Sequence, residues 1–298
     1  MRFLLAFLLA PFLTLLAHET TFPYLSEDVW PSFCNWRLSP KKTFDPLLVK
    51  RGDTILIEDI ECRLWETLER FTKFYLPRIQ HPVILVTPRT DYSLPGRFNG
   101  LLESDKIIAW FVQNIDRPPS SKLFSVPIGL SSKIWGRDTN HLGHYGSIAL
   151  ASSTALRKTL IYVNFSVASE ERERCLNHFR NLGGAHIERN QKSFEDYVRN
   201  LANSVFVISP PGNGEDCHRT WEALLMGCYP VVKTSPLDAM FQDLPVIIIK
   251  NWEEVTEEFL RSKLDELSRQ QWPREKLYAP YWFQKVSDLQ AKARSCSG

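Results

Sequence analysis

The sequence predicts an α/β protein built around parallel β-sheets. Its 298 residues are enough for about two domains. Hydrophobic residues make up 44% of the chain and charged residues 23%, which is typical of globular proteins and excludes disorder over most of the length. From residue 160 onward, short β-branched segments alternate with segments of helical periodicity. This alternation favours parallel strands joined by helices.

The second half of the chain carries the most regular alternation. Its apolar strands, such as 205–209 and 246–249, are typical of strands buried on both faces. Glycines end two of the helices, at 183–184 and at 227. The predicted strands span 160–163, 185–187, 205–209, 229–232 and 246–249, and the predicted helices span 169–182, 194–201, 216–226 and 256–269.

The first half has fewer clear helices. Residues 18–46 are rich in proline, tryptophan and turn residues and are interpreted as an irregular lead-in. A helix is predicted at 64–76, ended by Pro77. Strands are predicted at 54–60, 83–87, 107–112 and 123–128. Because periodicity is weak from 131 to 156, we expect an N-terminal domain over 18–155 and a C-terminal domain over 156–298.

Residues 1–17 form an apolar run after a single arginine. They are interpreted as a signal peptide, with a retained short signal anchor as the alternative, and either would associate the chain with a membrane during export. Six cysteines fit an oxidising compartment. A Cys34–Cys62 bridge is one possible pairing, and the absence of CxxC spacing argues against zinc. A net charge of +2 argues against nucleic acid as a partner.

Residues 209–232 (SPPGNGEDCHRTWEALLMGCYPVV) carry the chemistry. A buried strand leads through a glycine-containing loop into a helix, at the sheet edge where parallel α/β proteins bind ligands. Gly212 and Gly214 are expected to allow close backbone approach and positive φ. Arg219 offers a planar cation for a phosphate, and Glu222 a carboxylate for two hydroxyls. The ordinary alternative is a surface ion pair between these two, worth about 0.3–0.5 kcal/mol.

The runs RTWEAL at 219–224 and GCYPVV at 227–232 resemble the donor-binding half of exostosin-like glycosyltransferases. The segments DLPV at 243–246 and KNWE at 250–253 extend the resemblance. It implies a GT-B-like fold of two Rossmann-like domains with parallel sheets that face a cleft. The C-terminal domain would hold a nucleotide sugar and the N-terminal domain the acceptor. Because the chain is short, the N-terminal domain is expected to be reduced.

The resemblance also implies roles for individual residues. Glu222 is similar to the carboxylate that binds the ribose, and Arg219 to a contact of the diphosphate. A UDP-sugar is the expected donor, and no metal or other cofactor is expected. The remaining expected donor-binding residues are Asn164, Ser209, Gly212, Asn213, Gly214 and His218.

An inverting transfer needs a base beside the acceptor hydroxyl. Asp91, after the strand 83–87, is the first candidate, and Asp116, after the strand 107–112, is the second. Aspartate is also a common turn residue, so an ordinary loop role is the alternative for both. The aromatic tail at 278–283 is expected to pack onto the first domain.

The sequence therefore predicts a glycosyltransferase of the secretory or export route, acting on a glycan or other acceptor hydroxyl. The main alternative is a catalytically inactive sugar- or nucleotide-binding protein of the same fold, and a periplasmic small-molecule binding protein is the third reading. Glu222→Ala is expected to abolish donor binding and to leave the melting curve nearly intact.

Overall fold

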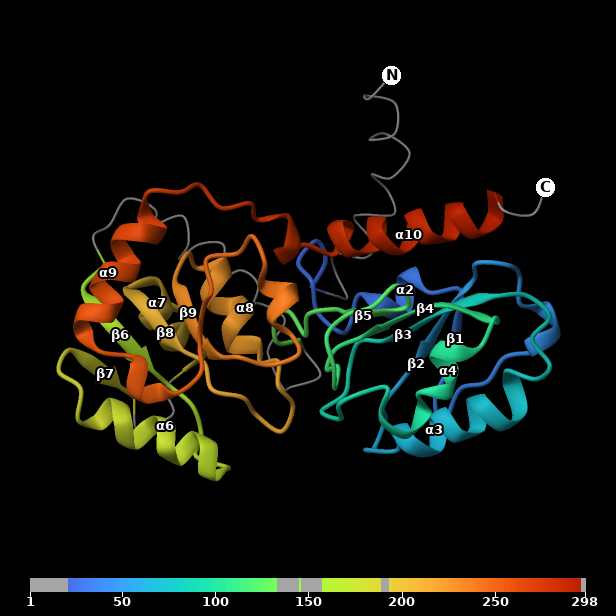
Figure 1. Ribbon diagram of the computed structural model, residues 1–298, viewed down its shortest axis with the longest axis horizontal. Helices are drawn as coiled ribbons and strands as arrows, with labels where there is room; N and C mark the ends of the chain where they lie inside the picture. Colours follow the sequence, from blue (N-terminus) through green and yellow to red (C-terminus); the bar gives the residue numbers. More distant parts are fainter. Residues whose placement is uncertain (1–20, 133–144, 146–156, 189–192, 296–298) are drawn as a thin grey trace, which may run out of the picture.

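The computed structural model describes residues 21–132, 145, 157–188 and 193–295. Two five-stranded sheets lie side by side along the long axis of the molecule, one in each half of the chain (Figure 1). All the strand pairs in both sheets are parallel. The predicted α/β class with two parallel sheets is confirmed. Residues 1–17 and the expected boundary near 155 lie outside the described residues.

The N-terminal sheet has the order β1-β2-β3-β4-β5, so its strands follow one another as they do in the chain. Helices α3 and α4 lie on one face, and α2 and α10 on the other (Figure 1). The strands are β1 (Trp36–Leu38), β2 (Thr54–Ile57), β3 (Val83–Thr87), β4 (Ile107–Val112) and β5 (Leu123–Ser125). This sheet has five strands, as many as the C-terminal sheet. The expected reduction of the N-terminal half lies in its helices, since α2 (Trp30–Phe33), α3 (Leu64–Arg70) and α4 (Gly100–Glu103) are short.

The C-terminal sheet has the order β10-β9-β8-β6-β7. Strands β6 and β8 are neighbours, although β7 lies between them in sequence, so the direction of winding reverses there. Such a switch point opens a crevice at the carboxyl ends of the two strands. The strands are β6 (Thr159–Val163), β7 (Ala185–Ile187), β8 (Ser204–Ile208), β9 (Tyr229–Lys233) and β10 (Ile247–Ile249), and the helices are α6 (Glu170–Arg180), α7 (Phe194–Ala202), α8 (His218–Leu225) and α9 (Glu257–Ser268).

Short helical turns complete the described residues. The helix α3 continues directly into a π-helical turn, η2, so the single helix predicted at 64–76 changes its winding at residue 71. The turns are η1 (Pro46–Leu48), η2 (Phe71–Tyr75), η3 (Gly96–Phe98), η5 (Asp238–Phe241), η6 (Trp252–Glu254) and η7 (Glu275–Leu277).

The last helix, α10 (Ala279–Ser295), returns from the C-terminal half and lies on the N-terminal sheet (Figure 1). Phe283 stacks on Phe33, with ring centroids 4.2 Å apart, and lies edge-on to Trp30. Further along, Gln290 donates a hydrogen bond to the carbonyl of Gly52. The prediction that the aromatic tail packs onto the first half is confirmed.

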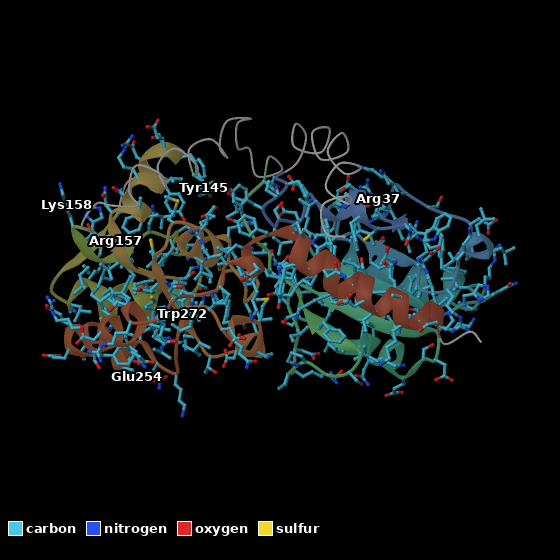
Figure 2. The ribbon with its side chains drawn as sticks, turned by 90° about the horizontal axis from the view of Figure 1, so that it is seen from above. Arg37, Tyr145, Arg157, Lys158, Glu254 and Trp272 are labelled. Carbon is cyan, nitrogen blue, oxygen red and sulfur yellow. The ribbon has the colours of Figure 1, made fainter. Side chains whose placement is uncertain are left out.

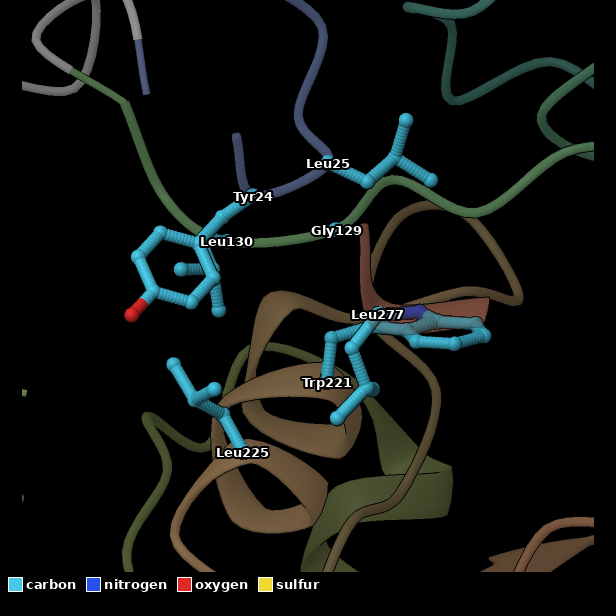
Figure 3. A pocket seen from close by; sticks show the side chains of 7 residues that line it. All are labelled: Tyr24, Leu25, Gly129, Leu130, Trp221, Leu225 and Leu277. Carbon is cyan, nitrogen blue, oxygen red and sulfur yellow. The ribbon is translucent and has the colours of Figure 1, made fainter. Parts of the chain in front are cut away.

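The two halves meet through an apolar contact on α8 (Figure 3). Trp221 and Leu225 of this helix, with Leu277, face Tyr24, Leu25 and Leu130. The side chains fill the space between them and leave essentially no room for a ligand. Gly129 is needed here because its φ is +68° and an added Cβ would overlap the carbonyl of Leu25. One hydrophobic core therefore runs through both halves, and a second, smaller core lies within the C-terminal half.

Arg157, labelled in Figure 2, joins three element ends inside the C-terminal half. Its guanidinium donates to the carbonyls of Ala202, Ser204 and Met226 at 2.6–3.0 Å. These carbonyls belong to the end of α7, the start of β8 and the residue that caps α8. One cation thus satisfies backbone acceptors that would otherwise be left without partners.

The five described cysteines are all free thiols, so the possible Cys34–Cys62 bridge is not formed. Cys62 is exposed, and burial raises the pKa of Cys34 to about 12, which keeps that thiol protonated and unreactive. Among the described helices, none has the length and apolar character needed to span a bilayer.

Candidate functional site

The switch point of the C-terminal sheet places two predicted residues side by side. Asn164 directly follows β6 and Ser209 directly follows β8, and these two strands are paired. Nine residues separate the end of β8 from the start of helix α8 at His218, and Arg219 lies in the first turn of that helix. The Arg219 Nε donates to the Asn164 carbonyl at 2.8 Å, and its Nη1 lies 3.4 Å from the Ser209 hydroxyl. The sequence prediction thus brought together residues that are neighbours in the structure.

A second arginine stands beside the first and was not predicted. Arg172, in the first turn of α6, donates to the carbonyls of Pro211 and Ser166. Its guanidinium lies 6.0 Å from the ring centre of Phe165, and that of Arg219 lies 5.4 Å from the same ring. Burial, and then the charge of Arg219, lower the pKa of Arg172. Among the described residues neither guanidinium has a carboxylate partner, so the pair is suited to an anion.

Glu222 does not pair with Arg219, so the surface ion pair considered from the spacing is wrong. The Glu222 side chain is buried, with 3% of the residue exposed. Its Oε1 accepts from the Ser131 hydroxyl at 2.9 Å, and its Oε2 from the Tyr197 hydroxyl at 2.6 Å. Burial raises the pKa of Glu222, but His218 and these hydroxyls, with that of Tyr145, lower it more, so the pKa lies below its usual range. The group is an ionised carboxylate inside the protein.

This burial corrects the expectation that Glu222→Ala would leave the melting curve nearly intact. A buried carboxylate with two charge-assisted hydrogen bonds contributes to folding, and its removal leaves two hydroxyls without their acceptor. His218, the other predicted residue of α8, lies at the edge of the site, where its Nδ1 donates to the Gly129 carbonyl at 2.8 Å. It therefore joins α8 to the segment that leaves the N-terminal half.

The loop at 210–214 (PPGNG), called the glycine loop from here on, is shaped by contacts with the N-terminal half of the protein. Neither Gly212 nor Gly214 has a positive φ, so this part of the expectation is wrong. The reason for glycine is close contact: an added Cβ on Gly214 would overlap the Asn114 amide, and one on Gly212 would press on Arg172. Within the loop, the Gly212 N–H donates to the Gly214 carbonyl at 2.9 Å. The loop is thus a fixed turn held against the N-terminal half.

Asp216 fixes this contact between the halves. Its carboxylate accepts from the backbone N–H of Ile128 at 2.7 Å and from the Trp221 indole at 2.9 Å. Its own N–H donates to Asn114, whose amide donates in turn to the Thr90 carbonyl. Burial raises the Asp216 pKa to about 6 despite these donors. Asp216 and Asn114 were not predicted as site residues, and they position the loop rather than face a ligand.

The two predicted bases lie in different surroundings. Asp91 follows β3, and its Oδ2 lies 3.5 Å from the side-chain amide of Asn213, so it borders the glycine loop across the contact between the halves. Asp116 is held by Arg117 at 2.6 Å and accepts from the Gly96 N–H. The hydrogen bond from Arg117 lowers the pKa of Asp116. The structure brings Asp91 to the other predicted residues, and it binds Asp116 into a turn on the N-terminal half.

Among the described residues, no group of three or more histidine, cysteine, aspartate or glutamate side chains is placed to hold a metal ion. An open hollow of about 600 Å³ lies elsewhere, at the edge strand β1, and is bordered by Trp36, Arg37 and Phe44. Arg37 is paired there with Glu58 at 2.7 Å. This hollow is remote from the switch point, and the polar groups at the switch point remain the candidate site.

Residues 145–292 match the family model described as the RXYLT1 C-terminal domain. The resemblance of the C-terminal half to exostosin-like glycosyltransferases is therefore confirmed. A crystal structure of a GtfA/B complex aligns over 83% of this chain with 11% identity and a TM-score of 0.34. The chain covers 55% of the length of that structure. No curated protein matches the sequence.

Proposed function

We propose that the protein is an inverting glycosyltransferase that moves a sugar from a nucleotide-sugar donor to a hydroxyl of a glycan or glycoconjugate. The observation that carries the proposal is the pair of guanidiniums at the switch point of the C-terminal sheet. Arg172 and Arg219 share the ring of Phe165, and neither has a carboxylate partner among the described residues. A diphosphate is the ligand whose charge and size fit two adjacent arginines.

The chemistry of sugar transfer suggests a role for each polar group at the switch point. Negative charge develops on the departing diphosphate as its bond to the sugar breaks, and fixed cations stabilise that charge. Arg172 and Arg219 would supply it, so we propose that the transfer needs no metal ion or other cofactor. Glu222 would recognise the hydroxyls of the ribose, and Asn164, Ser209 and the glycine loop would border the nucleotide.

The acceptor hydroxyl must lose a proton to a base on the opposite side of the sugar. We propose Asp91 for this role because it faces the glycine loop from the N-terminal half. Asp116 is the weaker candidate, since the hydrogen bond from Arg117 lowers its pKa and makes it a poorer base. The N-terminal half would then hold the acceptor.

The family model that matches the C-terminal half is that of a xylosyltransferase, so UDP-xylose is the first donor to test. We propose that the protein acts in the secretory or export pathway and associates with a membrane through residues 1–17. Nucleic acid is not a proposed partner, since the net charge is only +2.

Calorimetric titration with UDP and UDP-xylose tests the proposal. We expect Arg172→Ala and Arg219→Ala each to weaken UDP binding roughly tenfold to a hundredfold, the effect of one hydrogen bond to a charged group. Arg180→Ala is the matched control, because Arg180 ends the same helix as Arg172 and is exposed. An unchanged affinity for UDP in both variants would refute the assigned phosphate site.

The second candidate function is a nucleotide-binding protein of the same fold that transfers nothing. The occupation of Glu222 by two hydroxyls of the chain itself favours it, because this carboxylate has no oxygen left without a partner. Release of UDP from UDP-xylose, measured with and without glycan acceptors, separates the two functions. Turnover requires the transferase, and tight binding of UDP-xylose without release of UDP favours the binding protein.

A further inference from the structure

Two hydroxyl groups from distant parts of the chain converge on one carboxylate. Ser131 follows Gly129 in the segment that leaves the N-terminal half, and Tyr197 lies on α7. The Ser131 hydroxyl donates to Oε1 of Glu222 at 2.9 Å, and the Tyr197 hydroxyl donates to Oε2 at 2.6 Å. Each carboxylate oxygen therefore has one of these hydroxyl donors, and the buried Tyr145 hydroxyl, which also lowers the Glu222 pKa, lies beside them.

This arrangement has the form in which a carboxylate binds a vicinal diol, with one hydroxyl on each oxygen. Here both hydroxyls come from the protein. Glu222 is buried, and Tyr197 is half-buried as a residue although burial raises the pKa of its hydroxyl. A carboxylate can accept about four hydrogen bonds, but Glu222 is enclosed by the protein, so a diol that reaches it must occupy the space that these hydroxyls fill.

We propose that Tyr197 and Ser131 are internal competitors for Glu222, which a vicinal diol such as that of a ribose displaces when it binds. These two hydroxyls would then set the affinity of the site for the nucleotide. This inference rests on the proposed function and deepens it, since it names the residues against which the donor competes.

The inference has an unusual energetic consequence. Without its Tyr197 hydroxyl partner, the buried Glu222 lacks a donor on Oε2, so the ligand-free protein loses stability. In the ligand-bound protein the diol supplies that donor, so the same substitution costs little there. Tyr197→Phe should therefore lower the stability of the free protein and tighten diol binding. A purely structural hydroxyl would lower the stability and either weaken the binding or leave it unchanged.

The test is calorimetric titration of the full chain with UDP, with 2′-deoxy-UDP as the probe that lacks the diol. We expect Tyr197→Phe to bind UDP roughly tenfold more tightly than the unmodified protein and 2′-deoxy-UDP with little change. Urea denaturation should show a lower midpoint for the same variant. Ser131→Ala should also tighten UDP binding and lower the urea midpoint. It provides the same test if Tyr197→Phe does not fold.

Tyr281→Phe is the control, because the Tyr281 hydroxyl lies on α10 and makes no hydrogen bond among those of the described residues; neither quantity should change. If the unmodified protein binds UDP and neither variant binds it more tightly, this inference is wrong and the proposed function stands. Equal tightening for UDP and 2′-deoxy-UDP would also overturn it, since the diol would then be irrelevant. If neither the unmodified protein nor any variant binds UDP, both the inference and the proposed function fail.

Discussion

Replacing Glu222 by alanine is expected to destabilise the folded protein by about 3–5 kcal/mol. The carboxylate is buried and accepts two hydrogen bonds, from Ser131 and Tyr197. A hydrogen bond to a charged group contributes roughly 1.5–3 kcal/mol, and two of them account for most of the loss. Glu222→Gln keeps the shape and one carbonyl acceptor, so it should cost less, about 1–2 kcal/mol.

Urea denaturation followed by tryptophan fluorescence measures this loss, since Trp221 is buried on the same helix. Glu258→Ala is the matched control: Glu258 is exposed in the first turn of α9, and its loss should change stability by less than about 0.5 kcal/mol. A loss of stability below about 1 kcal/mol for Glu222→Ala would refute the reasoning, because removing a buried carboxylate leaves two hydroxyl donors without their acceptor.

Three further substitutions test the contact between the halves. Gly129→Ala should cost at least about 2 kcal/mol in urea denaturation, because its φ is +68° and a Cβ would overlap the Leu25 carbonyl. Gly214→Ala should lower the free energy of unfolding by about 1–3 kcal/mol, because the added Cβ would overlap Asn114. Gly183→Ala is the control and should be neutral, since its Cβ would contact no atom. Equal effects of the two substitutions would contradict a close contact between Gly214 and Asn114. The pKa of Asp216 is raised from 3.8 to about 6, so the folded state holds a proton that the unfolded state releases, and stability falls as pH rises through this interval. Between pH 4 and 7 the unmodified protein should therefore lose about 2 kcal/mol more than Asp216→Asn, and parallel pH profiles would contradict the raised pKa.

Local sequence patterns predicted most of the fold. The apolar runs that become β3, β4 and β8 are buried strands, and the alternation after residue 160 is the doubly wound sheet. Strand β1 was missed because it has only three residues in a segment rich in proline and turns. Helix α10 was missed because its first turn is aromatic, and those residues serve packing against Phe33 and Trp30.

The candidate site was predicted most completely where its residues lie close together in the chain. Arg219, Glu222 and the glycine loop occupy one strand–loop–helix segment, so their proximity follows from the sequence. Arg172 lies in the run EERER, which is typical of a solvated helix face, and only the tertiary structure places it beside Arg219. Ser131 and Tyr197 gave no local signal, because their common partner is a carboxylate on a third element.

Hydrogen–deuterium exchange of the full chain with and without UDP tests the central claim most directly. The account predicts slower amide exchange in residues 164–172 and 209–219, the two segments that carry the paired arginines and the glycine loop. Little change is predicted in strands β1 and β2 of the N-terminal half. Unchanged exchange in both segments at saturating UDP, or protection confined to the hollow at β1, would contradict the assignment of the switch point as the nucleotide site.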